Sequence, residues 1–103
     1  MISILFNITI KVGKEKEFYD LAVRLTEATR TEDDGCLTYV YLRQQDNPNE
    51  YVLNEQWRDQ EALDAHLAHL QALLGPPAPG ERLPRAFLDL CEKTRSVFYD
   101  VVA

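Results

Sequence analysis

The stretch "CLTYVYLRQQDNPNEYVLNEQW", residues 36–57, contains the clearest structural signal in this chain. Two runs rich in β-branched and aromatic residues, 36–44 and 50–57, flank the segment QDNPN. Asp, Asn and Pro favour turns, and two strand-like runs joined by so short a segment pair as an antiparallel hairpin. The topology can therefore be built outward from a central hairpin.

A strand and a helix are expected before the hairpin. The run "ISILFNITIKV", residues 2–12, alternates between two faces. The face predicted to meet the core holds Ile4, Phe6, Ile8, Ile10 and Val12. After Gly13 the period changes to that of a helix, which ends in the acidic turn TEDDG. The predicted apolar stripe of this helix is Phe18, Leu21, Ala22, Leu25, Ala28 and Thr29.

A second helix and a last strand are expected after the hairpin. Asp59 can cap a helix over residues 60–74, because its side chain can accept hydrogen bonds from the free amides of the first turn. Four prolines and two glycines exclude a regular element from 75–84. Residues 85–93 are predicted to form one or two helical turns, and 94–103 a closing strand.

This order of elements, βαββαβ, is the split β-α-β arrangement of a ferredoxin-like, two-layer α+β sandwich, here one domain over 1–103. Two helices on one sheet face leave the other face either wet or buried against a second copy. The strand residues that favour burial are Leu5, Thr9, Val40 or Tyr41, Val97 or Phe98, and Tyr99. We therefore predict a homodimer with the sheets packed face to face.

Composition excludes several classes of partner. Eleven basic against seventeen acidic residues give a net charge of −6, and the basic residues are scattered, so nucleic acid is not an expected partner. No apolar run approaches the roughly 20 residues of a membrane helix, and 2–12 lacks the features of a signal peptide. Cys36 and Cys91 are predicted to be buried free thiols. The expected location is cytoplasmic.

Three features together resemble a known family. They are "GCLTY" at residues 35–39, the Glu55-x-Trp57 pair, and His66 nine residues after that tryptophan. In this order they resemble the antibiotic biosynthesis monooxygenase (ABM) domain, whose members are small dimeric α+β barrels. The resemblance implies a set of activities: cofactor-independent oxygenation of anthrones and quinols, haem degradation, or isomerisation of a signal molecule. Fold alone does not choose among them.

An aromatic slot is predicted beside the third strand. A cofactor-free oxygenase needs an apolar site with few polar groups, to bind a flat phenol and remove its proton. Trp57 shares a strand face with Glu55, Leu53 and Tyr51 in a regular strand, and these would form one wall. Tyr39 and Tyr41 share a face of the preceding strand. Ordinary packing accounts for them, and contact with a substrate is the sharper alternative.

His66 lies on the apolar stripe of the second predicted helix and should face the sheet. One interpretation is a general base or hydrogen-bond donor to a substrate oxygen. The other is a structural histidine tied to a backbone carbonyl or to Glu55. His69, one turn on, is expected at the rim. Two histidines three residues apart lack a clear third ligand, since only Glu55 is a candidate, so no metal site is predicted.

Haem is also disfavoured by the sequence. Haem-degrading relatives use an asparagine on their first strand, but Phe6 occupies the matching position here and Asn7 is displaced to the opposite face. Those relatives also have a tryptophan where this chain has His66. Asn7, with Ser3 and Thr9, is expected to line the dimer interface.

The leading hypothesis is a cofactor-independent monooxygenase that oxidises a quinol or polycyclic phenol with dioxygen. His66 and Trp57 are the expected catalytic residues. The expected substrate contacts are Glu55, Tyr39, Tyr51, Phe6 and His69. The alternatives are a non-catalytic dimeric domain that binds a small aromatic ligand, and an isomerase of a small oxidised metabolite. The loop 75–84 would be either a lid over the pocket or a surface connection.

Overall fold

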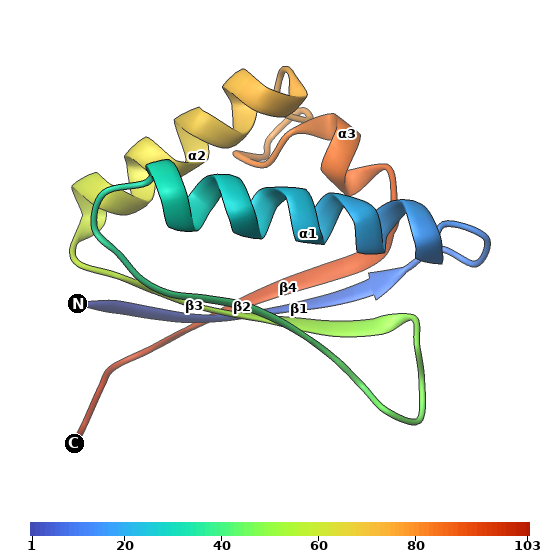
Figure 1. Cartoon of the computed structure of the whole chain (residues 1–103), viewed down its shortest axis with the longest axis horizontal. Coiled ribbons are helices and arrows are strands. Elements are labelled where there is room, and N and C mark those ends of the chain that lie inside the picture. Colours follow the sequence, from blue (N-terminus) through green and yellow to red (C-terminus); the bar gives the residue numbers. More distant parts are fainter.

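A computed structural model describes all residues, 1–103, as a four-stranded antiparallel sheet with its helices on one face (Figure 1). The elements in chain order are β1 (Ile2–Ile10), α1 (Glu15–Glu32), β2 (Cys36–Arg43), β3 (Glu50–Trp57), α2 (Gln60–Leu74), α3 (Arg85–Leu88) and β4 (Cys91–Tyr99). The strand order is β2-β3-β1-β4. The ferredoxin-like α+β architecture is therefore confirmed.

The core lies between the sheet and the helices. Ile4, Phe6, Ile8 and Ile10 of β1 are buried, as the alternation predicts. The helix α1 buries Phe18, Ala22, Leu25 and Thr29 against them. Val12 departs from the prediction and is 91% exposed. The reason is that β1 ends at Ile10 and the chain turns through Gly13, whose φ is +92°.

The last strand begins at Cys91, earlier in the chain than the predicted residue 94. Only Arg85–Leu88 is helical, and Cys91 already pairs with Ile10 of β1. The free edge of β1 offers backbone partners along its length, and these outweigh the helical period of "RAFLDLCEK". The strand β4 ends at Tyr99, so the last four residues of the predicted strand lie outside it.

Helix α2 follows the prediction closely. The Asp59 side chain accepts a hydrogen bond from the Ala62 amide at 2.9 Å, which satisfies a free donor of the first turn. Residues 75–84 form no helix or strand beyond an isolated bridge between Pro77 and Pro84. None of the helices combines the length and apolar character needed to cross a membrane.

The face of the sheet turned away from the helices is uncovered in this chain (Figure 1). Cross-strand pairing puts Val97, Leu5, Asn54 and Val40 in one row on this face. Tyr41 and Phe98 belong to the opposite, helix-facing side, because they pair with Leu53 and Ile4. The sequence left a choice between Val40 and Tyr41 and between Val97 and Phe98. Val40 and Val97 are the residues that lie on the open face.

Candidate functional site

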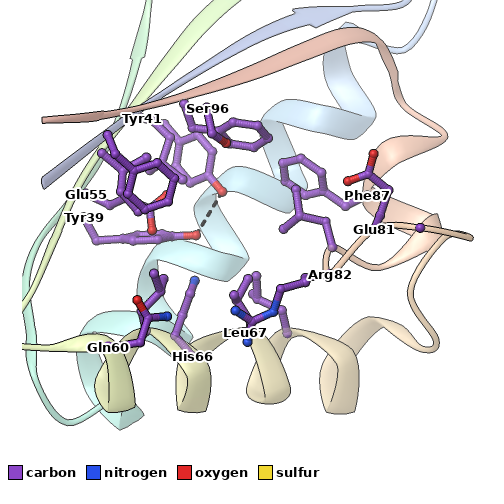
Figure 2. Close-up of a pocket in the computed structure, with 18 residues that line it drawn as sticks. Tyr39, Tyr41, Glu55, Gln60, His66, Leu67, Glu81, Arg82, Phe87 and Ser96 are labelled. Atoms are coloured by element: carbon purple, nitrogen blue, oxygen red, sulfur yellow. Dashed lines mark hydrogen bonds between the residues drawn. The ribbon is translucent and has the colours of Figure 1, made fainter. Parts of the chain in front are cut away.

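A cavity of about 300 Å³ lies between the helix-facing side of the sheet and α2 (Figure 2). This volume is at the lower limit of ordinary ligand sites, which suits a small aromatic molecule. The loop 75–84 and α3 contribute to its lining. The lining residues are Ile4, Phe6, Tyr39, Tyr41, Leu53, Glu55, Gln60, Leu63, His66, Leu67, Leu70, Gly80, Glu81, Arg82, Leu83, Phe87, Ser96 and Phe98.

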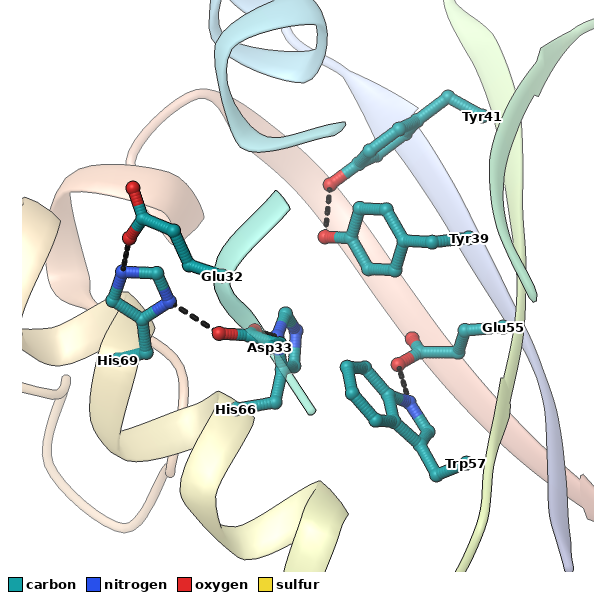
Figure 3. A network of polar contacts seen from close by, with 8 residues as sticks. All are labelled: Glu32, Asp33, Tyr39, Tyr41, Glu55, Trp57, His66 and His69. Carbon is teal, nitrogen blue, oxygen red and sulfur yellow. Dashed lines mark hydrogen bonds and ion pairs between the residues drawn. The ribbon is translucent and has the colours of Figure 1, made fainter. Parts of the chain in front are cut away.

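His66 points from α2 into the space beneath the sheet and is held there by Asp33 (Figure 3). Its Nδ1 lies 2.5 Å from Oδ2 of Asp33, the residue that ends α1. Both side chains are almost fully buried. The expected structural partners, Glu55 or a backbone carbonyl, were wrong, because the end of α1 brings a carboxylate closer. Asp33 thus forms an acid–imidazole pair with His66.

The geometry fixes which nitrogen of His66 is free. A neutral ring that donates Nδ1–H to Asp33 carries its lone pair on Nε2. The structure gives His66 a hydrogen bond at Nδ1 and none at Nε2, and His66 lines the cavity, so Nε2 is the ring nitrogen left free for a molecule bound there. Burial lowers the pKa of His66, against the hydrogen bond and charge of Asp33, which raise it. A neutral imidazole with an accessible lone pair is suited to accept a proton.

Glu55 also lines the cavity, and it is bound to Trp57 rather than to His66. Its Oε1 accepts a hydrogen bond from Trp57 Nε1 at 2.7 Å. Burial raises the pKa of Glu55 to about 7, against the Trp57 hydrogen bond, which lowers it. Trp57 is fully buried and packs against His66 with ring centroids 4.4 Å apart. The indole therefore lies behind the cavity wall, where it holds both Glu55 and His66 in place.

The burial of Glu55 predicts a pH-dependent loss of stability. Because its pKa is higher in the folded state, its contribution to stability is present below the unfolded value near pH 4.5 and is lost as pH rises toward 7. We expect Glu55→Gln, which keeps an acceptor for Trp57, to be more stable than the wild type by about 3 kcal/mol at pH 8. The difference should vanish at pH 4. Urea unfolding at both pH values measures it, and equal differences would contradict it.

Two tyrosines form the sheet side of the cavity, and their hydroxyls are 3.1 Å apart. Burial raises the pKa of both Tyr39 and Tyr41, so both remain neutral phenols at physiological pH. The Tyr39 ring also meets His66 edge-on, at 5.3 Å between centroids. Phe6 lines the cavity beside Phe87, whose ring stacks on it. The site is thus an aromatic enclosure with few polar groups.

Two of the predicted contact residues lie away from the cavity. Tyr51 is buried and packs against Phe18 of α1, with centroids 4.9 Å apart. His69 lies on the outer side of Asp33 and lines a separate surface hollow. Sequence reasoning also missed Asp33 and Phe87. Asp33 lies in "TEDDG", which the sequence shows only as the end of a helix. Phe87 lies in the short helix 85–88, and the sequence does not show which way its side chain points.

The metal and haem alternatives find no support in the side-chain directions. His66 and His69 both direct Nδ1 at Asp33, while Glu55 is turned toward Trp57 (Figure 3). Asn7 lies on the open face of the sheet, where it donates a hydrogen bond to the Arg95 carbonyl, so it cannot approach a group in the cavity.

Both cysteines are free thiols, as predicted. Cys91 is buried, whereas Cys36 is only half-buried.

Comparisons with known proteins agree with this architecture. The sequence model described as "Antibiotic biosynthesis monooxygenase" matches residues 1–73. A crystal structure of an antibiotic biosynthesis monooxygenase is 25% identical, with all of both chains covered and a TM-score of 0.77. A mutant of SnoaB, a cofactor-independent oxygenase from Streptomyces nogalater, is 21% identical, with 97% of this chain and 91% of that chain covered and a TM-score of 0.73.

One curated relative is an uncharacterized protein of Synechocystis, sll1783. It is 35% identical over 60 residues, which cover 58% of this chain and 40% of that protein. The match therefore spans less than half of the relative's length.

Proposed function

Because this chain belongs to the antibiotic biosynthesis monooxygenase family, we propose that it is a cofactor-independent monooxygenase that oxidises a quinol or polycyclic phenol with dioxygen. The observation that carries the proposal is the aromatic cavity into which His66 opens its free Nε2, with Asp33 behind it. One structure named as a monooxygenase and another named as a cofactor-independent oxygenase share the fold and support this activity.

In the proposed reaction, His66 Nε2 accepts the hydroxyl proton of the substrate, and Asp33 stabilises the resulting imidazolium. The substrate anion is electron-rich and gives an electron to dioxygen, after which the two radicals combine to form a C–O bond. Loss of water from this adduct leaves one oxygen atom in the product. The substrate supplies all the electrons, so no external reductant is consumed.

The remaining residues bind and orient. Tyr39, Tyr41 and Phe87 would enclose the flat ring system, where apolar walls exclude water. Trp57 would act through Glu55 and His66, both of which it contacts, rather than through the substrate. The loop 75–84 supplies Arg82, whose guanidinium lies 2.9 Å from Asp64 of α2 and fastens the loop across the cavity. This contact favours a lid over a mere connection.

Oxygen uptake tests the function. Purified protein in chelator-treated buffer, with menadiol or an anthrone and no added cofactor, should consume one dioxygen per substrate above the spontaneous rate. The product should gain one atom of ¹⁸O from ¹⁸O₂. Uptake no faster than the protein-free control across both substrate classes would reject the proposal.

A second candidate is isomerisation, favoured by the two proton-handling groups on one cavity. His66 would accept a proton while neutral Glu55, with its pKa near 7, would donate one at another atom of a small oxidised metabolite. This reaction proceeds without oxygen. Conversion under anaerobic conditions, with no uptake in air, would select it over oxygenation.

We also propose that the uncovered sheet face forms a homodimer, as the row Val97, Leu5 and Val40 supports. Leu5→Lys would place a charge in the centre of this row. Sedimentation velocity should then show a dimer for the wild type and a monomer for the variant. A monomeric wild type at micromolar concentration would exclude the dimer.

A further inference from the structure

A second imidazole shares the carboxylate that holds His66 (Figure 3). Oδ2 of Asp33 lies 2.5 Å from His66 Nδ1, and Oδ1 lies 2.5 Å from His69 Nδ1. The other nitrogen of His69, Nε2, lies 3.0 Å from Oε2 of Glu32. These four side chains therefore form one continuous polar chain that begins at the cavity.

Exposure rises steadily along this chain. The side chains of His66 and Asp33 are 2% and 7% exposed. That of His69 is 21% exposed, and that of Glu32 is 59% exposed. Water therefore reaches one end of the chain, while the other end is the group we propose as the base. A change of charge at the outer imidazole has a direct path to the inner one.

We propose that His69 is a positioning residue for His66, which acts through Asp33 to orient the buried ring and to couple its protonation to that of a ring in contact with solvent. The inference rests on the proposed function for its catalytic consequence. When His69 is charged, it competes for the negative charge of Asp33, and Asp33 then stabilises a proton on His66 less strongly. When His69 is neutral, Asp33 acts on His66 alone.

The surrounding groups leave this coupling intact. Asp34, Arg58 and Glu61 surround the same surface hollow as His69. Arg58 is occupied by Asp34 at 3.3 Å and Asp59 at 3.1 Å, and no bond joins it to Asp33. From the sheet, Glu55 and Tyr39 face His66 without a hydrogen bond to it. His66 and His69 are thus the two side chains that form hydrogen bonds with the Asp33 carboxylate.

Burial is the largest cause that lowers the pKa of His66, and the charge of His69 lowers it further, against Asp33, which raises it. Removal of the His69 charge should let Asp33 act fully on His66, so that the buried ring binds its proton at higher pH. Loss of the imidazole altogether should also loosen the orientation of Asp33.

Imidazole ¹⁵N NMR across a pH titration tests the coupling without any substrate. In the wild type, the charge of His69 should hold the midpoint of His66 down. In His69→Gln, the midpoint of His66 should therefore lie at higher pH than in the wild type. In His69→Ala, the Nδ1 proton of His66 should also exchange faster with solvent. Glu61→Gln is the matched control, because it removes a charge from the same hollow at a residue that forms no hydrogen bond or ion pair with either ring.

An unchanged His66 midpoint in His69→Gln would overturn the coupling, as would an equal change in Glu61→Gln. In an active enzyme, the acidic limb of the kcat/KM profile should move to higher pH in His69→Gln by the same amount as the NMR midpoint. A protein that oxidises no quinol but shows the NMR shift would refute the proposed function and leave the coupling standing. An active protein without the shift would refute the coupling alone.

Discussion

Replacement of His66 by glutamine is expected to lower kcat/KM for the oxygen-dependent reaction by about 100-fold or more, the range typical of a lost general base. Glutamine can still donate a hydrogen bond to Asp33, so the loss isolates the proton acceptor rather than the anchor. The fall should lie mainly in kcat, because the aromatic walls that bind the substrate are unchanged. Steady-state oxygen uptake over a pH series measures both parameters.

Leu67→Ala is the matched control for this experiment. Leu67 lies on the same helix and lines the same cavity, but it handles no proton. Its truncation should weaken substrate binding and raise KM, while kcat falls much less. Activity of His66→Gln within a few-fold of the wild type, with native circular dichroism, would remove His66 from the mechanism and direct attention to Glu55.

Gly35→Ala should destabilise the fold by about 3 kcal/mol, from two separate causes. The φ angle of Gly35 is +82°, a conformation that side chains disfavour. An added Cβ would also lie 2.6 Å from Cβ of Ala62, which fits only if α2 shifts. The Gly35 carbonyl accepts a hydrogen bond from the Arg58 amide at 2.8 Å, so this turn ties the end of α1 to the start of α2.

Gly13→Ala separates the two causes. Its φ is +92°, but an added Cβ meets nothing within 4 Å, so only the backbone term applies, about 1 kcal/mol. Urea unfolding of both variants gives the difference. Equal losses would show that the contact with Ala62 relaxes without cost. A larger loss in Gly35→Ala should be accompanied by a weakened Asp33–His66 contact, since the same turn follows Asp33.

The site was predicted only in part. His66 was expected to face the sheet, and it does, because the stripe of α2 is a local property that the sequence displays. Trp57 was expected to wall the slot, yet it lies behind His66 and Glu55. The alternation of β3 shows which face a side chain occupies, but not which neighbour covers it. Depth within a layer depends on the packing of α2 above the strand.

The amino-acid sequence already shows the order of elements, the central hairpin, the Asp59 cap and the helix-facing stripes. All of these depend on residues within a few positions of one another, so their period and spacing are visible in the chain. Two contacts become visible only in the folded chain: Asp33 holds His66, 33 residues away, and His69 shares the carboxylate. Such contacts depend on where one helix ends relative to another, a distance in space that no local pattern encodes.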